Sequence, residues 1–111
     1  MKRGEVWFAN LNPSKGSETA KRRPVLIVSN DASNRVASTV TILPITSNVT
    51  RVYPFEVALA KGAGGLSKAS KAQAQQVRTI SRERIFGKRI SALLHDDMAK
   101  VDAALRLHLS L

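Results

Sequence analysis

The chain of 111 residues carries 18 Lys and Arg against 8 Asp and Glu, which gives a formal net charge of +10. This length fits a single domain, residues 1–111, with one hydrophobic core. The charge implies a polyanionic partner, and nucleic acid is favoured over a membrane because the apolar runs are short. The chain has no Cys, so disulfides, thiolate nucleophiles and Cys-based zinc sites are excluded. No hydrophobic export segment follows the basic N-terminus, and we therefore expect a cytoplasmic protein with no membrane association.

The first half of the chain alternates β-type segments with turns. Strands are predicted at 5–10, 24–29 and 38–45, and the continuous Val, Leu and Ile run of the second predicts burial on both of its faces. Residues 30–35 indicate a turn or one short helical turn. Trp7 is expected to be a core or interface aromatic, because aromatics make up only 5% of the chain and a base-stacking surface needs more.

The second half predicts further strands and then a helix. The strands are expected at 55–59, 72–80 and 87–90. The glycine-rich segment 61–65 lacks the ending of a phosphate-binding loop and is expected to be a flexible linker. From about Leu94 the apolar residues recur at helical spacing, which predicts a C-terminal helix. The expected fold is therefore mainly β, a small barrel or sandwich that carries a C-terminal helix.

The loop between the first two strands is the strongest candidate site, because loops held by rigid strands often carry function. It contains the carboxylate of Glu18 and three consecutive cations, Lys21, Arg22 and Arg23. A basic triplet by itself is most often a solvated charge run. Pro24 weakens that interpretation, because it biases Arg23 towards an extended backbone and gives its side chain a defined direction.

Two further polar groups follow strands. Thr46, Ser47 and Asn48 end the third predicted strand, where they form either a site or an ordinary polar turn. Gln76 and Arg78 have the same parity in the predicted strand 72–80 and are expected to share one of its faces.

Taken in order, these features resemble the MazF/PemK family of bacterial toxin endoribonucleases. The segments that carry the resemblance span nearly the whole chain and are Arg3-Gly4-Glu5-Val6-Trp7, Asn12-Pro13-Ser14-Lys15-Gly16-Ser17-Glu18, Arg23-Pro24-Val25, Pro44-Ile45-Thr46-Ser47, Tyr53-Pro54-Phe55-Glu56-Val57 and Gln76-Val77-Arg78-Thr79-Ile80.

The resemblance implies an SH3-like β-barrel with a C-terminal helix, and a homodimer with active sites in the groove between the subunits. It also implies sequence-specific cleavage of single-stranded RNA without a metal or other cofactor, and inhibition by an acidic MazE-like antitoxin. The composition agrees with the absence of a metal, because no Cys, His pair or carboxylate cluster offers a divalent-ion site.

The resemblance also assigns residues. Arg23 and Thr46 match the catalytic arginine and the site threonine of the family, and Glu18 matches a carboxylate implicated in some members. By its chemistry Arg23 suits a phosphate clamp, and Glu18 can accept the proton of the RNA 2′-hydroxyl. The residues expected to contact RNA are Ser17, Lys21, Ser47, Asn48, Gln76 and Arg78. Some relatives have a His in the first loop and an Asp after the last motif, whereas this chain has neither, so their acid–base assignment does not transfer.

Two alternatives belong to other classes. One is a non-catalytic toxin of the same fold that binds DNA gyrase, as CcdB does, and the other is a basic RNA-binding barrel of ribosomal type. The combination of Arg23, Thr46 and Gln76 favours cleavage, because a gyrase poison does not need them. The sequence thus predicts an mRNA interferase, the toxin of a toxin–antitoxin pair, that leaves 2′,3′-cyclic phosphate and 5′-hydroxyl ends.

Overall fold

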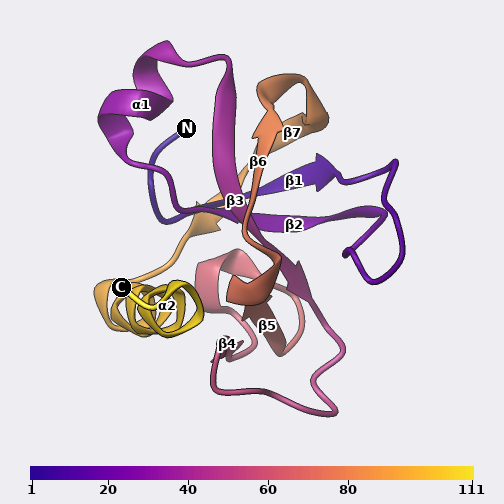
Figure 1. The fold of residues 1–111 in the computed structure, drawn as a ribbon, viewed down its shortest axis with the longest axis vertical. Helices are drawn as coiled ribbons and strands as arrows, with labels where there is room; N and C mark the ends of the chain where they lie inside the picture. Colours follow the sequence, from indigo (N-terminus) through magenta and orange to yellow (C-terminus); the bar gives the residue numbers. More distant parts are fainter.

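The computed structural model describes every residue from 1 to 111 and contains a seven-stranded antiparallel sheet and two α-helices (Figure 1). The elements in chain order are β1 (Glu5–Asn10), β2 (Arg22–Ile27), α1 (Asp31–Val36), β3 (Thr39–Thr46), β4 (Glu56–Leu59), η1 (Ala63–Gly65), β5 (Ser70–Gln73), η2 (Ala74–Gln76), β6 (Arg78–Ser81), η3 (Arg82–Arg84), β7 (Ile85–Ala92) and α2 (His95–Leu109), where η denotes a 3-10 helix.

The sheet is organised around β3. The strand order is β4-β5-β3-β2-β1-β7, and β6 also pairs with β3. One edge of β3 pairs with β2, while its other edge pairs with β6 in the first half and with β5 in the second. The prediction of a mainly β fold with a C-terminal helix is confirmed. The closed barrel is wrong, because β4 and β7 do not pair with each other: α2 packs against β4 and η1 packs against β7.

The strand β2 is buried on both faces, as its apolar run predicts. Val25 and Ile27 belong to one cluster of buried side chains, and Leu26 between them belongs to the other. Val101 and Ala104 of α2 complete the second cluster, so the helix covers that face of the sheet. Burial of each such aliphatic side chain stabilises the fold by about 1.5–3 kcal/mol. No helix combines the length and the apolar composition needed to cross a membrane.

The predicted strand 72–80 is interrupted. Ala72 pairs with Ile45 and Arg78 with Ile42, so β3 advances by three residues while its partner advances by six. The three extra residues form η2, whose Ala74 is buried in the core. The expectation that Gln76 and Arg78 share a strand face is therefore wrong, because Gln76 lies in η2 outside the ladder. The expected strand 87–90 is confirmed as the middle of the longer β7.

The glycine-rich segment 61–65 is not a flexible linker. It forms the turn η1, and Gly64 is buried with a φ of 57°. A Cβ at this position would lie 2.8 Å from the Val6 Cγ2 and 2.9 Å from the Leu93 Cδ2. The sequence suggested mobility because glycines are common in loops, but here the missing side chain allows the turn to pack on the core.

These contacts predict that Gly64→Ala lowers the free energy of unfolding by about 1–3 kcal/mol more than Gly62→Ala does. Both glycines have a positive φ, so both substitutions carry backbone strain, but a Cβ at Gly62 has no neighbour within 4 Å. Urea unfolding of the two variants measures the difference. Equal losses of stability would show that η1 does not pack as described.

Candidate active site

The loop between β1 and β2, residues 11–21, is closed at its base by hydrogen bonds. The Leu11 N–H donates to the Lys21 carbonyl at 2.9 Å, and the Lys21 N–H donates to the Asn12 Oδ1 at 3.0 Å. Arg78 and Arg84 each donate from Nη1 to a carbonyl at this base, of Leu11 and Asn10 respectively, both at 3.1 Å. Lys21 has a φ of 74°, an uncommon conformation for a residue with a side chain, and it is held there by these bonds.

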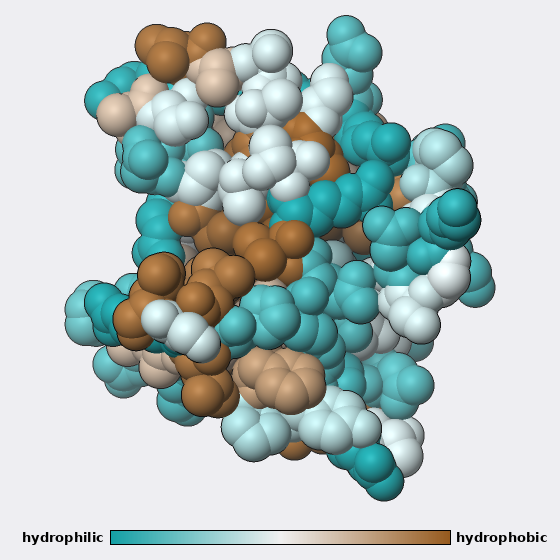
Figure 2. Space-filling view, in the orientation of Figure 1, coloured by the Kyte–Doolittle hydropathy of each residue, from teal (hydrophilic) through white to brown (hydrophobic).

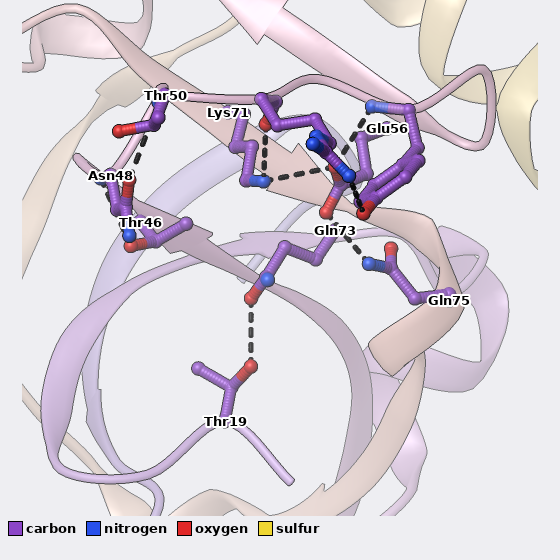
Figure 3. Close-up of polar contacts among 10 residues, drawn as sticks. Thr19, Thr46, Asn48, Thr50, Glu56, Lys71, Gln73 and Gln75 are labelled. Atoms are coloured by element: carbon purple, nitrogen blue, oxygen red, sulfur yellow. Dashed lines mark hydrogen bonds and ion pairs between the residues drawn. The ribbon is translucent and has the colours of Figure 1, made fainter. Parts of the chain in front are cut away.

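Two glutamines hold the middle of the same loop. The side chain of Gln76 accepts from the Thr19 N–H at 3.2 Å and donates to the Ser17 carbonyl at 3.1 Å. The Thr19 hydroxyl donates to the Gln73 Oε1 at 2.7 Å (Figure 3). Gln76 was expected to contact RNA, but one donor and one acceptor of its side-chain amide hold the loop in position.

Arg23 and Thr46 meet across the β2–β3 pair. The Arg23 Nε donates to the Ala20 carbonyl at 2.7 Å, and its Nη1 donates to the Thr46 Oγ1 at 3.2 Å. A guanidinium has five N–H donors, so these two bonds leave three free. Arg23 is half-buried, and its fork is thus held in one orientation with donors to spare.

The Thr46 hydroxyl is also committed as an acceptor. It accepts from the Arg23 Nη1. It also accepts from the Asn48 N–H at 3.2 Å (Figure 3). Both lone pairs of the oxygen are then used, which leaves its hydrogen free to be donated to another group. A cationic fork and a hydroxyl donor at the end of β3 form an arrangement suited to binding phosphate oxygens.

The other two cations of the basic triplet behave differently. Lys21 is exposed on the loop, and the Arg22 guanidinium lies 5.2 Å from the centre of the Phe86 ring. Phe86 stacks on Phe8 of β1 with ring centres 6.0 Å apart. Only Arg23 of the triplet is bonded to another site residue, so the three cations are not one uniform patch.

A cavity of about 300 Å³ lies beside Arg23, and its wall includes Ser47, Lys68 and the Phe8 ring. Phe8 and its stacking partner Phe86 are 40% and 38% exposed. Together they form an aromatic surface that the sequence did not indicate. Phe8 and Phe86 face each other because β1 pairs with β7, and no local pattern connects positions so far apart in the chain.

A second cavity, of about 330 Å³, is lined by Glu18, Gln76 and Arg78. The Glu18 Oε1 accepts from the Lys15 N–H at 2.7 Å, so the carboxylate folds back on its own loop. Glu18 makes no ion pair. The structure thus groups the predicted residues in two places: Arg23 and Ser47 line the first cavity, and Glu18, Gln76 and Arg78 line the second. Thr46 and Asn48 line neither cavity but are linked to Arg23 by the hydrogen bonds of the Thr46 hydroxyl. Ser17 and Lys21 are exposed on the loop.

A buried ion pair supports the end of β3 from the other side, and sequence reasoning missed it. The Lys71 Nζ lies 2.9 Å from the Glu56 Oε1, and the two side chains are 10% and 1% exposed. Lys71 also donates to the Arg51 carbonyl at 2.7 Å, and Gln75 donates to the Glu56 Oε2 at 2.6 Å (Figure 3). Because Lys71 pairs with Thr46 in the β3–β5 ladder, this network holds the segment that follows Thr46.

The network also lowers the pKa of the Glu56 carboxyl. Burial would raise the pKa of the Glu56 carboxyl, but hydrogen bonds from Gln75, from the Tyr53 N–H and from Lys71, together with the Lys71 charge, outweigh it. The pKa of Glu56 is therefore held below its ordinary value of 4.5. No group of three or more His, Cys, Asp or Glu side chains lies together as a metal site would require.

The fold and this site define a small basic β protein with a half-buried arginine that keeps free hydrogen-bond donors. A model of the family described as the PemK-like, MazF-like toxin of type II toxin-antitoxin systems matches residues 2–109. The chain belongs to this family.

Individual relatives match this chain over nearly its full length and theirs. The endoribonuclease MazF9 of Mycobacterium tuberculosis (strain ATCC 25618 / H37Rv) is 42% identical over 116 residues, which cover 100% of this chain and 98% of the relative. The crystal structure of MazF from Deinococcus radiodurans is 28% identical, with a TM-score of 0.86 over 100% of this chain and 97% of that one. An endoribonuclease from a mycobacterial species, in complex with its cognate antitoxin, is 26% identical, with a TM-score of 0.82 over 100% and 96%.

The lowered pKa of Glu56 predicts a pH dependence of stability. A carboxyl whose pKa is depressed on folding contributes stability that is present above pH 4.5 and lost as the pH falls through the folded pKa. Glu56→Gln should lower the free energy of unfolding at pH 7 by about 3 kcal/mol, because it leaves the Lys71 ammonium buried without a counter-charge. The loss should shrink in acid.

Urea unfolding at pH 7 and near pH 3 checks this expectation, with Glu83→Gln as the matched control. Glu83 is exposed and forms no ion pair, so its substitution should change stability little at either pH. A pH-independent loss in Glu56→Gln would show that the ion pair is not the source of the effect.

Proposed function

We propose that this chain is a toxin endoribonuclease that cleaves single-stranded RNA at the Arg23–Thr46 pair. The observation that carries the proposal is the hydrogen bond between Arg23 and Thr46, which leaves three guanidinium donors and one hydroxyl donor free. Family membership and the endoribonuclease relatives support the activity. The gyrase-binding alternative is not favoured, because it gives this arrangement no role.

The chemistry needs little beyond positioning and charge. The RNA 2′-hydroxyl attacks the adjacent phosphorus in line, a 2′-O–P bond forms and the P–O5′ bond breaks. A base takes the 2′-proton, and the leaving 5′-oxygen acquires a proton. The products are a 2′,3′-cyclic phosphate and a 5′-hydroxyl. No metal ion or other cofactor takes part in this proposal.

Arg23 and Thr46 act on the negative charge that develops at phosphorus. Arginine stays protonated at any working pH and can grip two phosphate oxygens with its planar fork. The free hydrogen of the Thr46 hydroxyl can be donated to a third oxygen. Fixed donors of this kind stabilise a charged transition state without reorganising during the reaction.

Glu18 is our candidate for the base. Its Oε1 is held by Lys15 and its second oxygen remains available. Because Glu18 and Arg23 line different cavities, this role requires an RNA that spans both of them. A base must come within hydrogen-bond reach of the proton it removes, so binding must bring the 2′-hydroxyl towards the loop.

The polar groups of the two cavities, of the β1–β2 loop and of the segment after Thr46 are proposed to hold RNA and to give sequence specificity. Those expected to contact it are Ser17, Lys21, Ser47, Asn48, Gln76 and Arg78. Figure 2 shows hydrophilic residues over the β1–β2 loop, whereas apolar residues gather over the C-terminal helix, where Leu107, Leu109 and Leu111 are exposed. A polar RNA surface and a separate apolar surface fit a chain that acts as a homodimer.

The cognate inhibitor is proposed to be an acidic, MazE-like antitoxin that forms a complex with the toxin. The net charge of +10 favours an acidic partner that competes with RNA for the cationic loop. The antitoxin complex of the mycobacterial relative supports this assignment. We place the action of the toxin in the cytoplasm, where its RNA substrates occur.

Arg23 provides the test of the enzymatic proposal. Arg23→Ala should slow cleavage about 10²–10³-fold, the size expected for losing one transition-state donor, with a much smaller loss of affinity. Arg23→Lys keeps the charge but not the planar fork, so it should restore most of the affinity and little of the rate. Single-turnover cleavage of a short RNA at saturating enzyme separates rate from binding.

The control variants are Arg22→Ala and Lys21→Ala, which remove neighbouring cations that do not contact Thr46. Their rates at saturation should stay near that of the unmodified chain. If either slowed cleavage as much as Arg23→Ala does, the triplet would be a generic cationic patch and the assigned role of Arg23 would be refuted.

A further inference from the structure

Gln73, the last residue of β5, makes a contact that the proposed reaction does not yet explain. Its Oε1 accepts a hydrogen bond from the Thr19 hydroxyl at 2.7 Å, and the two residues are 54 positions apart in the chain. Gln73 lies outside the lining of both cavities, whereas Thr19 is part of the wall of the second one. Figure 3 shows the Gln73 side chain reaching from the sheet to the loop.

The contact leads to Arg23 in two steps. Thr19 is followed by Ala20, whose carbonyl accepts from the Arg23 Nε at 2.7 Å. A hydrogen bond at Nε fixes the plane of the guanidinium, because all five donors lie in that plane. A shift of the Ala20 carbonyl would therefore tilt the fork that is proposed to bind the phosphate.

The fixed end of this connection lies next to Thr46. Lys71 and Ala72 of β5 pair with Thr46 and Ile45 of β3, so the strand that carries Gln73 is bonded to the strand that carries Thr46. The Thr19–Gln73 bond therefore fixes the position of the loop relative to β3 and β5. Through the loop it also fixes the position of Arg23. Without this bond, the loop would be held to the sheet only by Gln76, by the bond from Arg23 to the Ala20 carbonyl and by the bonds at the loop base.

We propose that the hydrogen bond between Thr19 and Gln73 positions Arg23: it orients the guanidinium for the transition state through the Ala20 carbonyl. This inference rests on the proposed function. Misplacing a catalytic group from a distance slows the chemical step while leaving substrate affinity in place.

The experiment measures single-turnover cleavage and RNA affinity separately. Gln73→Leu and Thr19→Val each remove one partner of the bond and should slow cleavage at saturation about tenfold, with the RNA dissociation constant changed by less than about twofold. Thr19→Ser keeps the hydroxyl and should retain most of the rate. Thr79→Val is the matched control, because it removes a threonine hydroxyl from the Thr41–Thr79 pair, which contacts neither Arg23 nor the loop.

Double substitutions identify the route of the effect. In an Arg23→Ala background, Gln73→Leu should slow cleavage no further, because the group it positions is already absent. An additional tenfold loss there would overturn the proposal, and so would a loss of affinity in place of rate. Unchanged cleavage in both Gln73→Leu and Thr19→Val would overturn it too.

Thermal unfolding of each variant shows whether a loss of rate reflects a loss of folded protein. If Gln73→Leu does not fold, the difference in cleavage rate between Thr19→Val and Thr19→Ser tests the proposal. The outcome also separates this inference from the proposed function. If the unmodified chain does not cleave RNA, or Arg23→Ala cleaves as well as it does, the proposed function fails. If those two results hold and only the Gln73 and Thr19 variants behave like the unmodified chain, the positioning role alone fails.

Discussion

The hydrogen bond from the Arg23 Nε to the Ala20 carbonyl is the contact on which the site depends. It joins a loop without regular structure to the start of β2. The conformation of the loop therefore determines the orientation of the Arg23 guanidinium. Fixing the backbone of each loop residue costs about 1–2 kcal/mol of conformational entropy, so the loop adopts one shape only if its contacts offset that cost. Part of that compensation comes from Thr19, which donates hydrogen bonds to Gln73 and Gln76, and from Arg78, which donates to the Leu11 carbonyl. Residues that a sequence motif would assign to substrate binding thus also serve to hold the loop still.

The strand β3 supplies the rigid half of the site. It pairs with β2, β5 and β6, and its side chains enter both buried clusters, so its path is fixed on both edges and both faces. Thr46 ends this strand, and the Glu56–Lys71 pair holds the chain that continues from it. A buried pair of this kind contributes little net stability compared with well-packed apolar side chains, but breaking it by removing one partner is costly. Its effect here is therefore to fix the position of a segment, which is what a site built at the end of a strand requires.

The parts of the structure that depend on local pattern could be predicted from the sequence. The two-sided burial of β2 and the helical spacing of α2 follow from side-chain periodicity, and the placement of Arg23 before a proline gave it a direction. The interruption of strand 72–80 by η2 could not be foreseen, because it arises where Ala74 packs into the core, and alternation alone describes an unbroken ladder. The ordered turn at Gly64 likewise depends on close approach to side chains from distant elements. The family resemblance named Arg23, Thr46 and Glu18 as site residues, but the hydrogen bond between the first two and the separate position of Glu18 depend on how the loop folds, which no spacing in the sequence encodes.

The central claim is that RNA supplies the nucleophile and the protein supplies oriented donors. It is tested most directly with a short RNA that carries a single 2′-deoxy substitution on the nucleotide 5′ to the scissile phosphate, compared with the all-ribose RNA in the presence of EDTA. The account predicts that the all-ribose RNA is cut to a 2′,3′-cyclic phosphate, detected by mass spectrometry, and that the substituted RNA binds but is not cut at that position. Cleavage of the substituted RNA at the same phosphate would contradict the account, because another nucleophile would then have to be at work.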